Sequence, residues 1–207
     1  MAERYLMTHS LLSSWLYAMK SNSYEDATSE RDSFAEFLQV LRREDTPTTE
    51  AMQNGIDFED LVTAIVNDDN EGMSRNSKWF NAAMEVAQIV DGGVLQYRAR
   101  RIVEVAGMTF VLYGRLDCLK AGTVIDIKFS KSYDVGKFVD STQHPTYLEL
   151  VPEADDFLYV VSNGSYVWKE RYRRDETKDI REYITQFIEW LILNNLLDTY
   201  KKHWVAL

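Results

Sequence analysis

Between residues 94 and 129 the sequence changes to a period of two, and this change constrains the fold more than any other feature. Three runs of alternating apolar and polar residues, at 94–105, 108–119 and 123–129, are separated by the pairs Ala106-Gly107 and Ala121-Gly122. Alternation places successive side chains on opposite faces of a strand, and pairs that contain glycine are typical of tight hairpin turns. The pattern therefore predicts an antiparallel meander of three strands.

Segments with helical spacing of apolar residues surround this meander. We expect helices over about 10–20, 32–41, 49–67, 76–91, 141–150 and 175–200. Two further strands, 156–162 and 165–172, flank Asn163-Gly164, which is the strongest hairpin signal in the chain. This order predicts an α/β fold with helices on both sides of one mixed sheet. We expect one domain over 1–207, with a helical part at 1–46 and an α/β core at 48–202.

The composition is that of a globular protein. Hydrophobic residues make up 45% of the chain, enough for a large core, and no apolar run approaches the roughly 18–20 residues of a membrane-spanning helix. The N-terminus lacks the basic and apolar segments of a signal peptide. The single cysteine, Cys118, excludes a disulfide within the chain and a four-cysteine metal site. We expect a cytoplasmic protein that does not bind membranes.

The charge is unevenly distributed along the chain. The net charge is −10, which disfavours general binding to nucleic acids because an acidic surface repels phosphates. The window from Gln96 to Asp140 nevertheless contains eight basic and five acidic residues, a net charge of +3, which leaves −13 for the rest. A polyanion could therefore approach this part of the protein and little else.

Two acids and a lysine lie in the second hairpin of the meander. If Ala121-Gly122 forms a two-residue turn, Lys120 opposes Thr123 and Asp117 opposes Asp126. Directly opposed carboxylates repel each other unless a proton or a cation lies between them, and a divalent ion with oxygen ligands suits such a pair. Lys128 is expected on the same face as Asp126, two residues further along. Taken alone, an Asp-x-Lys tripeptide is most often a solvated surface pair, and here it would be a salt bridge of Lys128 with either acid, worth about 0–1 kcal/mol. An acid on the partner strand favours a chemical role.

These residues also form a series of motifs. Asp117 is followed nine residues later by Asp126-Ile127-Lys128, with Gly55-x-x-x-Glu59 upstream and Gln143-x-x-x-Tyr147 downstream. Their order resembles the PD-(D/E)xK nuclease superfamily, most closely its RecB-like branch, which includes phage lambda-exonuclease-like enzymes. The resemblance covers about 95 residues, and it implies a restriction-endonuclease-like version of the α/β fold. The proline that usually precedes the first acid is replaced by Leu116.

The resemblance implies a role for each motif residue. Asp117, Asp126, Glu59 and the carbonyl of Ile127 would hold Mg²⁺ or Mn²⁺, and Lys128 would position or activate the attacking water. Gln143 and Tyr147 would contact DNA or orient Lys128, and Arg115 is a further candidate for binding substrate. Pro145 disfavours helical backbone in the residue before it, so Gln143 and Tyr147 share a helix face only if Pro145 falls in the first turn.

The implied activity is metal-dependent hydrolysis of DNA, most often as an exonuclease in phage-type recombination or DNA processing. DNA and a recombination protein are the expected partners, an oligomer is compatible with the branch, and a phage-encoded enzyme would act in the host cytoplasm. Two alternatives stay open. The chain could be a DNA- or protein-binding subunit of the same fold with weak catalysis, or an acidic protein-binding module whose acid pair is an ordinary surface feature.

Several other residues are expected to be structural. His144 is expected to be a solvated loop residue, Cys118 a small core residue, and Trp79 a packing residue. Glycine inside a predicted helix costs about 1 kcal/mol relative to alanine, so Gly55 suggests a close backbone approach. Arg98, Arg100 and Arg101 either contact phosphate or form the solvated side of the sheet.

Overall fold

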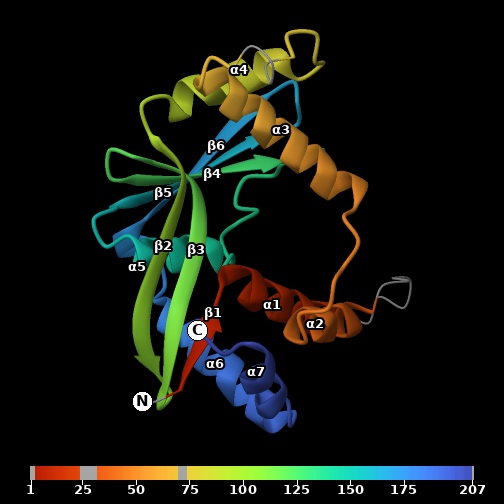
Figure 1. Cartoon of the computed structure of the whole chain (residues 1–207), viewed down its shortest axis with the longest axis vertical. Coiled ribbons are helices and arrows are strands. Elements are labelled where there is room, and N and C mark those ends of the chain that lie inside the picture. Colours follow the sequence, from red (N-terminus) through yellow and green to blue (C-terminus); the bar gives the residue numbers. More distant parts are fainter. Residues whose placement is uncertain (1–2, 24–31, 70–73, 207) are drawn as a thin grey trace.

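Six strands form one mixed sheet in the computed structural model, which describes residues 3–23, 32–69 and 74–206 (Figure 1). The strand order is β1-β3-β4-β5-β6, and β2 pairs with the other edge of β3. Strand pairs β1/β3 and β4/β5 are parallel, whereas β2/β3, β3/β4 and β5/β6 are antiparallel. The strands are β1 (Arg4–Met7), β2 (Val94–Val105), β3 (Met108–Lys120), β4 (Thr123–Phe129), β5 (Asp156–Ser162) and β6 (Val167–Arg173).

The predicted meander is confirmed as β2-β3-β4, with tight turns at both expected positions. Ala121 and Gly122 have φ values of 47° and 76°, and Ala106 and Gly107 have 51° and 73°. Positive φ at both central residues is the geometry of a type I′ turn, whose twist matches that of the flanking strands. Lys120 pairs with Thr123 as expected from a two-residue turn.

Helices cover both faces of the sheet, which confirms the α/β class (Figure 1). One apolar core lies beneath α3 (Glu50–Val66) and α4 (Phe80–Val90), where Phe58 and Val86 meet Ile125 and Ile127. The larger core, on the opposite face, contains Phe157 and Phe187. Its helices are α1 (His9–Ser23), α2 (Ser33–Leu41), α5 (Gln143–Leu150), α6 (Ile180–Leu193) and α7 (Leu197–His203), and a short 3-10 turn (Arg174–Glu176) precedes α6.

One edge of β3 is shared by two different strands, and this positions the site. The start of that edge pairs with β1 at residues 109–112, and its end pairs with β4 at residues 118–120. Between them, in the part of the chain that the structure describes, residues 113–117 pair with no strand on that edge. Helix α5 packs against this stretch, where a Cβ atom on Gly114 would lie 2.5 Å from the ring of Tyr147.

The first strand, β1, is absent from the prediction, which assigned only helices to residues 1–46. Four residues of this segment instead extend the core sheet, and Tyr5 also bridges to Val205 near the other end of the described chain. The predicted last helix is interrupted after Leu193 and continues as α7. None of the helices in the described residues is long and apolar enough to cross a membrane.

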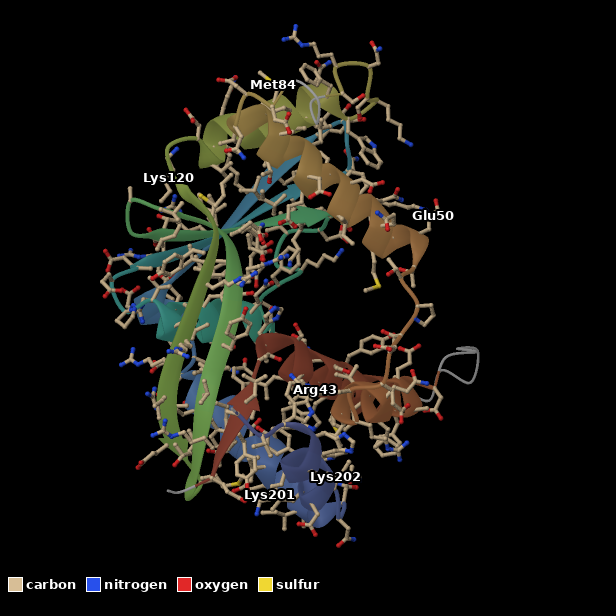
Figure 2. All side chains as sticks on the ribbon, in the orientation of Figure 1. Arg43, Glu50, Met84, Lys120, Lys201 and Lys202 are labelled. Carbon is tan, nitrogen blue, oxygen red and sulfur yellow. The ribbon has the colours of Figure 1, made fainter. Side chains whose placement is uncertain are left out.

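Helix α3 extends beyond the sheet, with Glu50 at its outer end (Figure 2). Met52 and Ile56, apolar residues of this outer half at helical spacing, are therefore exposed by 54% and 47%. Gly55 lies in this outer half, and a Cβ atom there would meet nothing within 4 Å. The expectation of a close backbone approach at Gly55 is wrong.

Candidate functional site

The predicted motif residues meet where β3 and β4 separate, beside the unpaired stretch of β3. Asp117 comes from β3, Asp126 and Lys128 from β4, and Glu59 from α3, while Gln143 and Tyr147 come from α5. The fold thus brings together residues that are more than 80 positions apart in sequence, from helix α3, two strands of the sheet and helix α5.

Asp117 occupies the point of separation. The last paired residues are Cys118 and Ile125, so Asp117 and Asp126 lie one step beyond the end of the ladder, in the predicted register. The Oδ2 atom of Asp117 accepts a hydrogen bond of 2.8 Å from the N–H of Ile127. The Asp117 carboxylate therefore accepts the hydrogen bond that a backbone carbonyl of β3 would accept if the ladder continued. Ile127 contributes its N–H group to the site.

Asp126 is buried, with 3% of its surface exposed. Its Oδ1 accepts a hydrogen bond from the side-chain amide of Gln143, whereas its Oδ2 lies 2.8 Å from Nζ of Lys128 as an ion pair and has no hydrogen-bond partner among the described residues. Burial alone lowers the pKa of Lys128, but the charges of Asp126, Asp117 and Glu59 raise it overall. Lys128 is therefore an ammonium ion at neutral pH.

Glu59 is held by a residue that the sequence does not reveal. The side-chain amide of Gln96 on β2 donates to Oε1 of Glu59, and Oε1 of Gln96 is buried with no hydrogen-bond partner among the described residues. Gln96 has a φ of 53° although it lies within a strand, next to the residues that pair with Leu116 and Cys118. A positive φ in a non-glycine strand residue is strained, and such strain gathers at functional sites. No sequence signal marks this glutamine.

The site carries more negative than positive charge. Burial, followed by the charges of Asp126 and Glu59, raises the pKa of Asp117 well above its ordinary value, and the Ile127 N–H and Lys128 only partly oppose this effect. Burial also raises the pKa of Glu59, although its hydrogen bond from Gln96 and the charge of Arg115 act in the opposite direction. One ammonium group therefore faces three carboxyl groups, two of which have raised pKa values.

The donor set fits a hard divalent cation in chemical type and charge, because carboxylate oxygens are the ligands that Mg²⁺ and Mn²⁺ prefer. The arrangement itself is not that of a closed metal site. Among the described residues, no group of three or more His, Cys, Asp or Glu side chains is placed to hold a metal ion. Each acid already contacts a protein partner, and a cation bound there would compete with these contacts.

Helix α5 contributes Gln143 and Tyr147 from one face. It begins at Gln143, so Pro145 falls in the first turn, as a shared face requires. The hydroxyl of Tyr147 donates to the carbonyl of Arg115 at 3.0 Å, again on the unpaired stretch of β3. The side chain of Arg115 is exposed, and the structure gives it no hydrogen bond or ion pair among the described residues.

His9, the first residue of α1, lies beside this group and was not predicted as a site residue. Its ring packs edge-on against Tyr147 at 5.3 Å between centroids, and its Nδ1 is buried without a partner in the structure. Burial, together with the nearby charge of Lys128, lowers the pKa of His9 to about 3. The imidazole is therefore neutral at physiological pH. His9 lies beside the site because α1 begins two residues after β1 ends, and β1 is held in the sheet.

The connection from Lys128 to Gln143 is fastened to the sheet by Glu170 of β6. Glu170 accepts hydrogen bonds from the hydroxyl groups of Tyr133 and Tyr172 and from the N–H groups of Gly136 and Phe138, the last two at 3.2 and 3.4 Å. This carboxylate therefore fixes the path of the segment that joins two sides of the site.

Three residues outside the acid cluster test the structural expectations. His144 is not a solvated loop residue: it is buried and stacks on Tyr172 at 4.1 Å, which makes it part of the packing under α5. Cys118 is buried as expected, and burial raises its pKa to about 11, so it is a core residue rather than a nucleophile. Trp79 packs against Phe58 and Phe129, as a packing residue should.

Comparisons with known proteins inform the fold and not the activity. No family model matches the chain, and no curated protein matches it in sequence. A solved structure described as the crystal structure of SSO0001 superposes with a TM-score of 0.55 at 15% sequence identity, over 94% of this chain and 79% of that one. At this identity the similarity supports the shared α/β architecture alone.

Proposed function

We propose that the protein is a metal-dependent DNA nuclease of the PD-(D/E)xK type. The observation that carries the proposal is the meeting of Glu59, Asp117, Asp126 and Lys128 at one buried, negatively charged point. These are the residues that the sequence resemblance selects, and they come from α3, β3 and β4. The narrower proposals, exonuclease action in phage-type recombination or DNA processing, rest on the sequence resemblance.

Each side chain has a distinct part in the proposed hydrolysis. Glu59, Asp117 and Asp126 would hold Mg²⁺ or Mn²⁺, which polarises the scissile phosphate and offsets the charge that develops on it. Lys128 is protonated, so it acts as a hydrogen-bond donor and a positive charge rather than as a base. It can orient a water molecule for attack and stabilise the negative charge of the transition state.

The residues of α5 act on the geometry of this group. Gln143 fixes one oxygen of Asp126 and so leaves the other to Lys128. Tyr147 holds the backbone of β3 at Arg115, two residues before Asp117. Both contacts keep the two acids in place across the gap between the strands.

The test is cleavage of linear double- and single-stranded DNA with Mg²⁺ or Mn²⁺, and with EDTA as the metal-free control. Lys128→Met and Asp126→Asn should each reduce cleavage by about 100- to 1000-fold, the usual cost of removing one group that stabilises a transition state. Lys120→Met is the matched control, because Lys120 also lies on this hairpin but donates to the carbonyl of Ile89 outside the site. Metal-dependent cleavage that persists in both site variants, with folding intact, refutes the assignment.

A second candidate, a DNA-binding subunit with weak catalysis, is favoured by the contacts that the acids already make. Lys128 pairs with Asp126 and Gln96 with Glu59, and both contacts compete with a bound cation. Thermal unfolding with and without Mn²⁺ separates the two candidates. A nuclease should be stabilised by Mn²⁺ in an Asp117-dependent manner, whereas a binding subunit should not respond.

A further inference from the structure

The hairpin of β2 and β3 has one face that packs on the core and one face that is open to solvent. Buried side chains at Ala99 and Val103 of β2, and at Leu112 and Leu116 of β3, define the packed face. By alternation the open face carries Arg98 and Arg100 of β2 and Tyr113 and Arg115 of β3, and all four side chains are exposed.

The register brings two arginines of this face directly opposite each other. Arg98 pairs with Arg115, and Arg100 pairs with Tyr113. Opposed side chains on one face have Cβ atoms about 4.5–5.5 Å apart, and like charges in that position destabilise a sheet. A fold has no structural reason to place two cations there, whereas a bound anion would remove the repulsion.

Within the described residues the structure gives Arg98, Arg100 and Arg115 no ion pair, in contrast with three other arginines of the strands. Arg101 pairs with Glu149 at 3.3 Å, and Arg171 and Arg173 of β6 pair with Asp156 at 2.7 Å and Asp175 at 3.5 Å. The uncompensated arginines of the sheet are therefore concentrated on the open face of the hairpin.

This basic face adjoins the acid cluster. Arg115 is two residues from Asp117, and its charge is close enough to lower the pKa of Glu59. Arg98 and Arg100 continue from Arg115 along the hairpin, away from the site. The whole chain has a net charge of −10, so a polyanion would be repelled elsewhere and attracted along this line.

We propose that the open face of the β2–β3 hairpin binds the phosphate backbone of the nucleic acid whose end or strand lies at the acid cluster. Cleavage of that nucleic acid at the acid cluster rests on the proposed function, whereas its binding to the hairpin does not. Guanidinium groups form paired hydrogen bonds to phosphate oxygens, and two arginines that repel each other gain most from a shared anionic partner. The exposed ring of Tyr113 lies beside Arg100 and offers a surface on which a base can stack.

The experiment measures binding of a fluorescent oligonucleotide by anisotropy in EDTA, over a range of salt concentrations, so that cleavage plays no part. The Arg98→Ala/Arg100→Ala variant should bind about tenfold more weakly at 0.1 M salt, and the slope of log K against log salt should fall by about two. The matched control is Arg171→Ala/Arg173→Ala, which removes the same charge from alternate positions of one strand, but from arginines that are paired with acids.

Each outcome decides the proposal. A selective loss in the Arg98/Arg100 variant, with unchanged melting temperature, supports the binding face even if the protein does not cut DNA. Equal losses in both double variants, no loss in either, or no binding by the unmodified protein would overturn it. Failure of cleavage in the presence of Mg²⁺, with binding intact, would instead overturn the proposed nuclease function.

Discussion

Replacing Gly114 by alanine tests how closely α5 must approach β3. The added Cβ would lie 2.5 Å from Cε1 of Tyr147 and 2.8 Å from Cδ1 of Leu150, both too short for carbon atoms. The ring of Tyr147 must therefore move, and its hydrogen bond to the carbonyl of Arg115 would be lost or weakened. Overpacking costs about 1–3 kcal/mol and a lost hydrogen bond about 0.5–1.5 kcal/mol, so unfolding free energy should fall by roughly 2–4 kcal/mol.

Chemical denaturation gives this free energy directly, and in a chain of this length it corresponds to a melting temperature lower by roughly 4–16 °C. Gly55→Ala is the matched control, since nothing lies within 4 Å of the position that its new Cβ would take. That substitution is in the middle of helix α3 and should raise stability by about 1 kcal/mol. The same chemical change is thus expected to act with opposite sign at the two positions.

A double-mutant cycle with Tyr147→Ala identifies the cause of the loss. With the ring removed, Gly114→Ala should cost at least about 1 kcal/mol less than in the unmodified protein, because the two residues contact each other. An equal cost in both backgrounds, or a cost below about 0.5 kcal/mol in the unmodified protein, would refute the close approach.

Asp117→Asn should raise the melting temperature at neutral pH and have little effect near pH 4. The pKa of Asp117 is raised in the folded state, so ionisation of this carboxyl group destabilises the folded protein as pH rises from the ordinary value of 3.8 through the raised pKa. A variant that is less stable than the unmodified protein at neutral pH would contradict this. Gln96→Gly should be more stable than Gln96→Ala by about 1–2 kcal/mol, because only glycine adopts a φ of 53° without strain; equal denaturation midpoints would argue against the left-handed backbone. Glu170→Gln should cost about 1–3 kcal/mol and speed hydrogen exchange at Gly136 and Phe138, whose N–H groups it binds; unchanged exchange would contradict the anchoring role.

The parts of the fold that depend on local chemistry could be predicted from the sequence. The Ala121-Gly122 pair set the register of β3 and β4, and with it the placement of Asp117 next to Asp126 at the end of the ladder. Pro145 limited where α5 could begin, and the helix starts at Gln143 as that limit requires. In each case neighbours in sequence decide the conformation, so a short window contains the necessary information.

The parts that depend on distant partners could not be predicted. Four residues, Arg4–Met7, form a strand only because residues 109–112 and the chain near Val205 lie alongside them, and the position of His9 follows from that strand. Gln96 is unremarkable in sequence, and its left-handed backbone lies opposite Asp117, where β3 and β4 separate. Met52 and Ile56 have a helical period, but α3 reaches past the sheet that would have covered them.

The gap in the edge of β3 has a mechanical consequence. Among the described residues, β1 lies on one side of this gap and β4, β5 and β6 on the other, and strand pairing connects the two parts through the hairpin of β2 and β3. Beside the gap the contacts to β3 are made by side chains, from Asp117 to the Ile127 N–H of β4 and from Tyr147 of α5 to the Arg115 carbonyl. The spacing of Asp117 and Asp126 is therefore set by side-chain contacts and not by a ladder of backbone hydrogen bonds.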